Sequence, residues 1–411
     1  MLDAPARPVP TRRAPLGRTV WALALVSLLT DLSSEMIYPL LPVFLTATLG
    51  AGAATLGAIE GAAETTAALL KLASGWWSDR VPRRKPLVVA GYGLASAARP
   101  LVALAGTAGQ VLAVRLVDRV GKGIRSSPRD ALLAAAVPAA QRGRAFGFHR
   151  AADHLGAVLG PLVAFALLRG AGVDVRTVFA LAAVPAALAM AALVFGVREA
   201  PAAPPPAAAP RAPRAGALGG ARPGRPLVAL LAAVTVFTLG NSADAFLLLR
   251  AAQLGVPTAM VPLLWALLHV VKSASSTPGG ALSDRVGRRP LIAAGWTVYA
   301  AVYLGFATAG AAWQAWALFA AYGLVSGLTE GAEKALVADL APAAGRGTAF
   351  GWYHAAVGAA ALPASLLFGV VWERYGAPAA FRVGAALAGA ALVILVALAR
   401  PRAGTRAGSA G

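Results

Sequence analysis

Long apolar stretches separated by short polar segments make up most of the chain. Each stretch has about 20 residues or more, the length of helix that crosses the hydrocarbon core of a bilayer. Twelve such stretches can be distinguished, at residues 20–48, 53–77, 86–106, 110–135, 145–168, 176–197, 227–250, 257–283, 290–309, 313–340, 347–371 and 377–399. The pattern therefore predicts an all-α membrane protein with twelve transmembrane helices.

Composition supports this prediction and excludes several other classes of protein. Of the 411 residues, 58% are hydrophobic and only 13% are charged, which is too apolar for a water-soluble domain. The absence of cysteine excludes disulfides, thiolate metal sites and cysteine nucleophiles. The first stretch holds Asp31 and Glu35 and has no small-residue cleavage site, so we expect a retained helix rather than a signal peptide.

The formal charge of +20 could suggest a nucleic-acid partner, but its distribution indicates membrane topology instead. The two termini and the loops on their side of the membrane carry 22 of the 37 Lys and Arg residues. The opposite loops carry five, namely Arg169, Arg176, Arg250, Arg374 and Arg382. This is the positive-inside pattern, so we expect a multi-pass protein of a bacterial cytoplasmic (inner) membrane with both termini cytoplasmic and no nucleic-acid partner.

The chain divides into two related halves. Residues 198–226 are rich in Pro, Ala, Gly and Arg, and we interpret them as a cytoplasmic linker. The linker separates residues 20–197 from 227–399, with tails at 1–19 and 400–411. GWWSDRVPRRK at 75–85 recurs as GALSDRVGRRP at 280–290, and VPAAQRGRAFGFHR at 137–150 recurs as APAAGRGTAFGWYH at 341–354. Two repeats at nearly one spacing predict two similar six-helix units.

These repeats resemble the signature of the major facilitator superfamily. The first copy comprises Gly75, Asp79, Arg80, Arg83 and Arg84, with Pro82 where glycine is usual, and the second comprises Gly280, Asp284, Arg285, Gly287, Arg288 and Arg289. The resemblance implies two pseudo-symmetric six-helix bundles, alternating access and a cytoplasmic gate. In such a gate, Asp79 and Asp284 accept hydrogen bonds from helix starts near Arg346 and Arg142. The alternative is that the arginines only fix topology.

A second motif, in the fifth segment, concerns the direction of transport. Gly156, Gly160 and Pro161 resemble the antiporter motif of proton-coupled drug exporters, although Ala164 and Phe165 replace two further glycines. Export is thereby favoured. The alternative is a stripe of small residues that lets two helices pack closely.

Several acids are candidates for proton coupling. Asp31 and Glu35 lie one turn apart on one helix face, and desolvation favours the protonated form of a membrane carboxyl group. The alternative is a permanent ion pair with a basic helix. The candidates are Asp31, Glu35, Glu64, Asp153 and His154.

The fourth segment carries a basic stripe of Arg115, Arg119, Lys122, Arg125 and Arg129 at helical spacing. The stripe could bind an anionic or zwitterionic solute, or pair with Glu60, Glu64, Asp130 and Asp153. Polar residues at similar depth on other segments complete the expected solute cavity. Its candidates are Tyr38, Arg115, Arg119, Lys122, Arg150, Asn241, Asp244, His269, Lys272, Glu330 and His354.

The motifs that the chain lacks also restrict its function. It has no Walker A loop, HExxH or GxSxG motif, so we expect neither ATP coupling nor an enzyme, and no cofactor. His149, Asp153 and His154 are close in sequence, but we expect hydrogen bonding or proton relay there rather than a metal. The hypothesis is a monomeric, proton-coupled exporter of a small solute within the lipid bilayer. The alternatives are a symporter that imports an anionic nutrient or metabolite, and a membrane sensor or scaffold that transports nothing.

Overall fold

The computed structural model describes residues 16–78, 81–138, 142–199, 224–340 and 346–397, and these residues form helices and turns without a strand. The elements before the 200–223 segment form the N-terminal half. They are α1 (Arg18–Ile37), η1 (Tyr38–Leu40), α2 (Leu41–Val43), η2 (Phe44–Thr48), α3 (Ala53–Ser78), α4 (Lys85–Ala98), η3 (Arg99–Leu104), α5 (Ala108–Ala135), α6 (Arg142–Phe165), η5 (Ala166–Gly170), α7 (Val175–Leu181), α8 (Ala183–Ala191) and η6 (Ala192–Gly196).

The elements after the same segment form the C-terminal half. They are α9 (Arg225–Gly240), α10 (Ala245–Gln253), η7 (Thr258–Met260), α11 (Val261–Val286), α12 (Arg288–Thr308), α13 (Ala312–Leu340), α14 (Arg346–Tyr375) and α15 (Ala377–Ala397).

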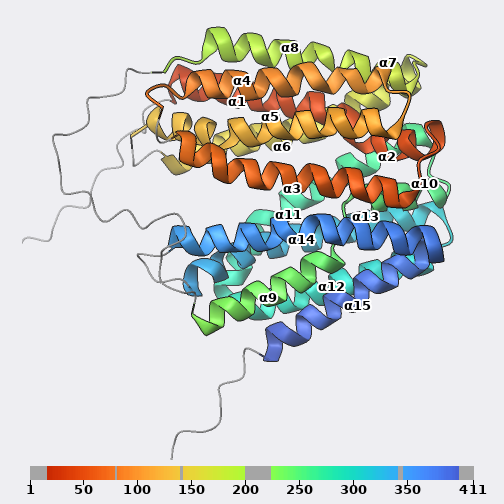
Figure 1. Ribbon diagram of the computed structural model, residues 1–411. Coiled ribbons are helices and arrows are strands. Elements are labelled where there is room, and N and C mark those ends of the chain that lie inside the picture. Colours follow the sequence, from red (N-terminus) through yellow and green to blue (C-terminus); the bar gives the residue numbers. More distant parts are fainter. Residues whose placement is uncertain (1–15, 79–80, 139–141, 200–223, 341–345, 398–411) are drawn as a thin grey trace, which may run out of the picture.

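The long helices run roughly parallel to one another, and each half packs mainly on itself (Figure 1). In the N-terminal half, α1 packs on α6 and α8, and α5 packs on α3 and α4. In the C-terminal half, α13 packs on α11 and α12, and α15 packs on α9 and α12. Between the halves, smaller contacts join α2 to α10 and η1 to α11, and two pairs of long helices make the largest contacts, α3 with α14 and α6 with α11. The site described below lies between these two pairs.

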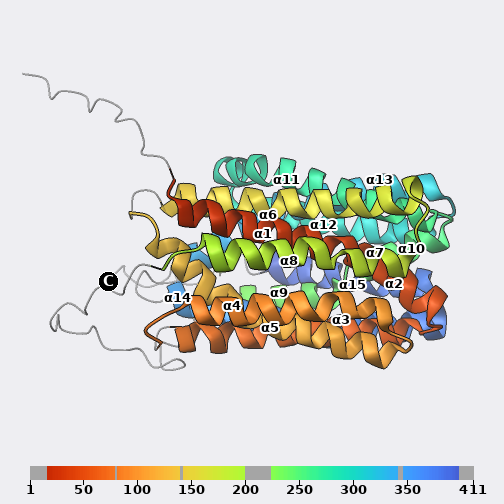
Figure 2. The same ribbon diagram turned by 90° about the horizontal axis from the view of Figure 1, so that it is seen from above.

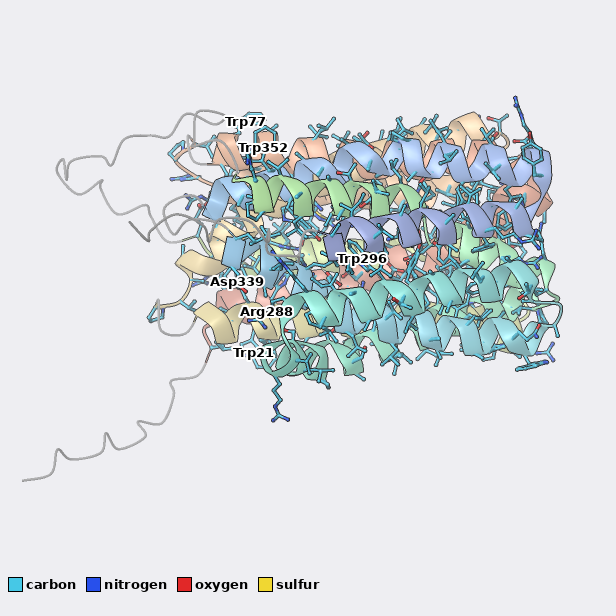
Figure 3. All side chains as sticks on the ribbon, turned by 90° about the horizontal axis from the view of Figure 1, so that it is seen from below. Trp21, Trp77, Arg288, Trp296, Asp339 and Trp352 are labelled. Carbon is cyan, nitrogen blue, oxygen red and sulfur yellow. The ribbon has the colours of Figure 1, made fainter. Side chains whose placement is uncertain are left out.

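The two ends of the molecule are defined by where the helices begin and end, and both carry exposed aromatic residues. The end where α1 and α9 begin and α15 ends is called the linker end, and the opposite one the far end (Figure 2). Exposed Trp21, Trp77 and Trp352 lie near the linker end (Figure 3), whereas exposed Trp313 and Tyr375 lie where α13 begins and α14 ends, at the far end. Trp and Tyr favour the interfaces of a bilayer, so these exposed rings indicate that the helices cross the bilayer from one end of the molecule to the other.

Within the described residues, nine helical spans are long and apolar enough to cross a membrane. They coincide with nine of the stretches predicted from the sequence. The other three predicted stretches form α3, α5 and α13, which have 26, 28 and 29 residues. These helices are long enough to cross a bilayer but carry charged side chains along their length, including the basic stripe of α5.

Two predicted stretches contain breaks. Stretch 20–48 changes geometry where α1 gives way to η1 at Tyr38, because Pro39 and Pro42 lack the N–H that a continuing α-helix needs. Stretch 227–250 divides into α9 and α10, with residues 241–244 between them outside any helix. This break carries Asn241 and Asp244 and lies in the middle of a candidate membrane span.

The hydrophobic core shows how the halves meet. At the far end, one cluster joins residues of both halves, for example Leu40 and Leu56 with Phe246, Leu264 and Phe368. Toward the linker end, each half has its own cluster, one around Leu23 and Tyr92 and the other around Trp296 and Leu395. The halves are therefore sealed together at the far end and separately packed at the linker end.

The contact between α3 and α14 is made by glycines. A Cβ on Gly61 would lie 2.8 Å from the Cα of Leu362, and one on Gly369 would lie 2.6 Å from the carbonyl oxygen of Ala53. A Cβ on Gly57 would overlap the carbonyl group of Ser365. Backbone therefore touches backbone along this contact, called the glycine seam, and no larger residue fits without a shift.

Candidate functional site: a charged cavity between the halves

Two adjoining cavities lie between the halves. The first has a volume of about 260 Å³ and is bounded mainly by α1, α5 and α6 on one side and α11 on the other. The second has a volume of about 440 Å³ and extends toward α9, α12 and α13. The two share Tyr38, Glu64, Asp244 and Lys272 as lining residues. The side chains of Glu64 and Glu330 are 50% and 47% exposed, so water reaches both cavities.

The α1 face of the first cavity presents two acids with different partners. Glu35 accepts a hydrogen bond of 2.6 Å from the indole N–H of Trp265 on α11, in the opposite half. The ring of Trp265 also lies 5.0 Å from that of Tyr38. The carboxylate of Asp31, one turn away, has neither a hydrogen bond nor an ion pair with any residue that the structure describes. The two acids therefore differ: Glu35 is bonded to the opposite half, and Asp31 has no partner within the described part of the chain.

The antiporter-like motif on α6 lies directly against these acids. A Cβ on Gly156 would lie 3.0 Å from the Cβ of Asp31, and one on Gly160 would lie 2.8 Å from the Cβ of Glu35. The motif thus lets α6 approach the acidic face of α1. Pro161 follows on the same helix.

Asp153 also lies on α6 and is well supplied with partners. Ser27 donates a hydrogen bond to it, and His149 Nδ1 and Arg150 Nη1 lie 3.6 and 3.5 Å from its Oδ2. His154 lines the first cavity without a hydrogen bond or ion pair to the described part of the chain. Among the described residues, no group of three or more His, Asp or Glu is arranged to hold a metal.

Most of the basic stripe on α5 is neutralised by acids. Asp118 accepts from Arg99 Nε at 2.7 Å. Arg115 Nη2 donates to both carboxylate oxygens of Glu60 at 2.8 Å, and this pair is buried. Arg119 lies 3.1 Å from Glu64. The ion pairs place these guanidinium groups toward the cavities and away from lipid, as buried charges require.

Two cations of the stripe are left over. Lys122 forms no ion pair with a described residue, although it lines the first cavity. Arg125 stacks at 4.1 Å over the ring of Tyr92, and its Nε and Nη1 atoms are buried with no hydrogen-bond partner among the residues that the structure describes. The N-terminal half therefore presents unpaired positive charge to the first cavity.

The C-terminal half presents an acid at the break between α9 and α10. Tyr322 donates a hydrogen bond of 2.6 Å to Oδ1 of Asp244, whose Oδ2 has no partner among the residues described. Tyr299 donates to Oδ1 of Asn241 at 3.1 Å, which fixes the neighbouring side chain. Two tyrosines thus stabilise the break, and Asp244 lines both cavities.

The remaining predicted cavity residues fall into two groups. Lys272 Nζ lies 3.2 Å from Glu330, which Lys334 also contacts at 3.1 Å. His269 lines the first cavity beside Trp265. His354, in contrast, is exposed on α14 beside Tyr353 and lines neither cavity, so the structure does not bring it to the site.

The family relationship follows from comparisons with known proteins. The model of the Major Facilitator Superfamily matches residues 23–272 and 245–411. The chain belongs to this superfamily. An uncharacterized transporter of the superfamily from Methanocaldococcus jannaschii is 33% identical over 364 residues, covering 87% of this chain and 89% of its own. The protein is therefore an integral membrane transporter of small-molecule solutes.

Solved structures of the superfamily share the fold at low identity. The nucleoside transporter NupG is similar with a TM-score of 0.77 at 13% identity, covering 93% of this chain and 100% of its own. A bacterial homologue of the human lysosomal transporter Spinster, in an inward-facing, unoccupied conformation, gives a TM-score of 0.72 at 17% identity. That likeness covers 93% of this chain and 95% of the homologue.

The signature of the superfamily lies at the linker end of the structure. Asp79 and Arg80 lie outside the described residues, as does the side chain of Asp284, so the expected contacts of both aspartates stay predictions. In the second copy, Arg288 contacts Ser283 at 2.6 Å and Asp339 at 3.5 Å, within the C-terminal half (Figure 3). Arg285 is exposed, and Arg289 is partly buried.

The first copy of the signature is followed by a reciprocal contact. Glu199 accepts hydrogen bonds from the backbone N–H groups of Arg84 and Lys85, at 2.7 and 2.9 Å, where α4 begins. Lys85 Nζ donates to the carbonyl groups of Val194 and Val197 at 2.9 and 2.7 Å. The signature region is thereby tied to the end of the N-terminal half.

Sequence reasoning missed two residues that organise the cavities. Trp265 lies one turn before His269, and with Lys272 these residues occupy one face of α11. The spacing of Trp265 from His269 and Lys272 could have indicated that Trp265 also faces the cavity. Tyr322 lies in an otherwise apolar run of α13, and its bond to Asp244 depends on the tertiary arrangement alone.

Proposed function

We propose that this transporter is a proton-coupled exporter that exchanges protons for a small solute. Residues 20–197 and 227–399 form two six-helix bundles joined by the 198–226 linker, and both termini lie in the cytoplasm. The bundles rock about the cavities between them. The described arrangement, sealed at the far end and separated at the linker end, is the state open to the cytoplasm.

The observation that carries this proposal is the hydrogen bond from Trp265 to Glu35 across the far end. A donor bonded to an ionised carboxylate is held more strongly than one bonded to a neutral acid. The bond therefore stabilises the sealed state most when Glu35 has lost its proton. Protonation of Glu35 weakens it and allows the far end to open.

This dependence favours exchange over cotransport. An exchanger must not change state while empty, because an empty return would waste the proton gradient. A symporter, in contrast, must return empty in every cycle. A contact that stabilises the unprotonated, empty carrier on one side opposes the symport cycle and suits antiport.

The test uses purified protein in liposomes with an acidic interior and an enclosed pH-sensitive dye. A panel of organic ammonium ions, carboxylates and sugars is added outside. An exchanger admits its solute while protons leave, so the interior becomes more alkaline. A symporter carries protons inward with the solute, so the interior becomes more acidic. Alkalinisation by any member of the panel beyond that in protein-free liposomes supports the proposal, and acidification beyond that in protein-free liposomes overturns it in favour of import.

Variants then identify the coupling acid. Asp31→Asn and Glu35→Gln should abolish the pH change while keeping exchange of labelled for unlabelled solute. Asp130→Asn is the matched control, because Asp130 pairs with Arg129 at 2.8 Å and lines neither cavity. Proton movement that persists in both cavity variants would remove these two acids from the coupling role.

A further inference from the structure

Some charged groups in the cavities have no ion-pair partner among the described residues, and they indicate the class of solute and how protons compete with it. We propose that the solute is a small organic ammonium ion held by Asp244, and that Lys122 repels it when Asp31 takes up a proton. The inference deepens the proposed function, and its coupling part rests on proton exchange. The argument depends on Asp244, Lys122 and Asp31, which all line the first cavity.

Asp244 provides an anchor for a cation. One of its oxygens is fixed by Tyr322 at 2.6 Å, and the other has no partner in the described part of the chain. The rings of Tyr38, Tyr299 and Phe237 line the adjoining second cavity. A carboxylate oxygen beside aromatic faces suits an ammonium group, which gains both an ion pair and cation–π contacts.

Neighbouring cations do not occupy this anchor. Lys272 lines both cavities, but its ammonium group is bonded to Glu330 at 3.2 Å. Asp244 itself forms no ion pair with any described residue. A carboxylate in a partly buried site requires a counter-charge, because an isolated charge in such a site is costly. The solute supplies that charge.

Lys122 lies on α5, in the half opposite to Asp244, and is close to Asp31. The charged groups within electrostatic range of Asp31 are Lys122 and Arg125 on α5, Asp153 on α6 and Glu35 on its own helix. Asp153 is near Arg150, Glu35 is bonded to Trp265, and Arg125 stacks on Tyr92. Lys122 itself lies near Arg119, Lys71 and the acids Glu64 and Asp31. Glu64 is already paired with Arg119 at 3.1 Å, so Asp31 is the acid near Lys122 that is not committed to another cation among the described residues.

This arrangement makes proton and solute exclude each other. With Asp31 ionised, Lys122 is compensated and Asp244 attracts an ammonium ion. When Asp31 binds a proton, the charge of Lys122 is uncompensated in the same 260 Å³ cavity, and it repels the ammonium ion. The proton and the solute then bind to opposite halves yet oppose each other through charge.

The test measures binding to the purified full-length protein in nanodiscs, without proton flux. The probes are alkyl- and arylammonium ions, each compared with the carboxylate and the alcohol of the same skeleton. We expect an ammonium ion to bind at mildly alkaline pH, and its carboxylate and alcohol to bind at least about tenfold more weakly. Acidification should weaken ammonium binding by about tenfold or more.

Four variants, one of them a control, separate the roles. Asp244→Asn should weaken ammonium binding at every pH by about tenfold or more, and Asp244→Glu should restore part of it. Lys122→Gln should keep binding at alkaline pH and lose most of its weakening by acid. Lys334→Gln is the control, because Lys334 contacts Glu330 but lines neither cavity, and it should retain the full pH dependence.

The outcomes distinguish this inference from the proposed function. Preferential binding of carboxylates, no binding of any ammonium ion, or unchanged binding in Asp244→Asn overturns the solute class. Unchanged acid weakening in Lys122→Gln overturns the coupling role of Lys122. If ammonium binding requires Asp244 while the liposomes show no proton exchange, the proposed antiport fails and the solute class stands.

Discussion

Trp265 on α11 and Glu35 on α1 form a hydrogen bond of 2.6 Å across the two halves of the molecule. The bond lies beside the contact between the rings of Tyr38 and Trp265, which are 5.0 Å apart. A titratable group therefore takes part directly in sealing the far end.

Replacing Trp265 with Phe removes this N–H donor but keeps an aromatic ring. A hydrogen bond to a charged group contributes about 1.5–3 kcal/mol, so the sealed state should lose roughly ten- to a hundredfold in population relative to the open one. We expect proton leakage without solute in Trp265→Phe liposomes, measured with an enclosed pH dye.

The chain offers a matched control for this change. Trp296 donates to Glu333 at 3.0 Å, and both residues belong to the C-terminal half. Trp296→Phe breaks a bond of the same kind without changing the contact between halves, so it should not leak protons. Equal leakage in both variants would show that lost packing, rather than the bond between halves, is responsible.

Small residues on α6 should tolerate no added methyl group. In Gly160→Ala, the new Cβ would lie 2.7 Å from the carbonyl oxygen of Leu32 and 2.8 Å from the Cβ of Glu35. Forced repacking of this kind costs about 1–3 kcal/mol, which should lower the unfolding temperature of the purified protein.

Gly389 on α15 is the matched position, since a Cβ there meets no atom within 4 Å. Alanine favours helix over glycine, so Gly389→Ala should instead stabilise the protein by about 0.5–1 kcal/mol. Equal stability changes at Gly160 and Gly389 would contradict the close packing of α1 on α6.

The buried pair of Arg115 and Glu60 should be sensitive to loss of one partner. Their side chains are only 10% and 2% exposed. Glu60→Gln leaves the guanidinium charge uncompensated and should lower the free energy of unfolding by about 3–5 kcal/mol, measured by denaturant titration.

Two comparisons accompany this measurement. The double variant Arg115→Gln, Glu60→Gln should recover much of the loss, because no isolated charge remains. Asp130→Asn, at an acid whose side chain is 49% exposed, should cost less, about 0–1 kcal/mol. A double variant no more stable than Glu60→Gln would contradict the interpretation.

A pH effect is expected at the loop that precedes α7. Hydrogen bonding to Thr177, first from its side chain and then from its backbone N–H, which donates to Asp174 at 3.0 Å, holds the pKa of Asp174 below its ordinary value. A lowered folded-state pKa means that the cap stabilises α7 above the unfolded pKa and is lost as pH falls through the folded pKa.

Hydrogen exchange in the first turn of α7 should therefore gain an acid-dependent opening in the wild-type protein. Asp174→Asn keeps a capping oxygen but cannot titrate, so it should remove that pH dependence. Opening that depends on acid equally in both proteins would exclude Asp174 as its cause.

The pattern of apolar stretches predicted the positions of the helices well, because length and hydropathy alone determine where a chain can cross a bilayer. It did not predict the break between α9 and α10. The sequence NSAD at 241–244 contains neither proline nor a glycine pair, and tyrosines from α12 and α13 stabilise the break. A break that is stabilised by residues of other helices cannot be recognised from the local sequence.

The sequence predicted many of the residues that line the cavities, but not which acid pairs with which cation. Asp31, Glu64, Asp153 and Lys122 all line the first cavity, as their charge within apolar segments indicated. The sequence could not show which cation each acid would meet, because α5 offers several at helical spacing. Arg150 lines the first cavity, whereas His354, its partner in the repeat, lines neither cavity, so the expected role of His354 stays a prediction.

The glycine seam between α3 and α14 has a mechanical consequence. Where backbone rests on backbone, few side chains interlock, so the two helices can turn against each other without a change of rotamers. Larger residues at such a contact would act as wedges that fix one tilt angle. Because the glycine seam lies on the boundary between the halves, we expect it to act as a hinge when one half moves relative to the other beside the charged cavities.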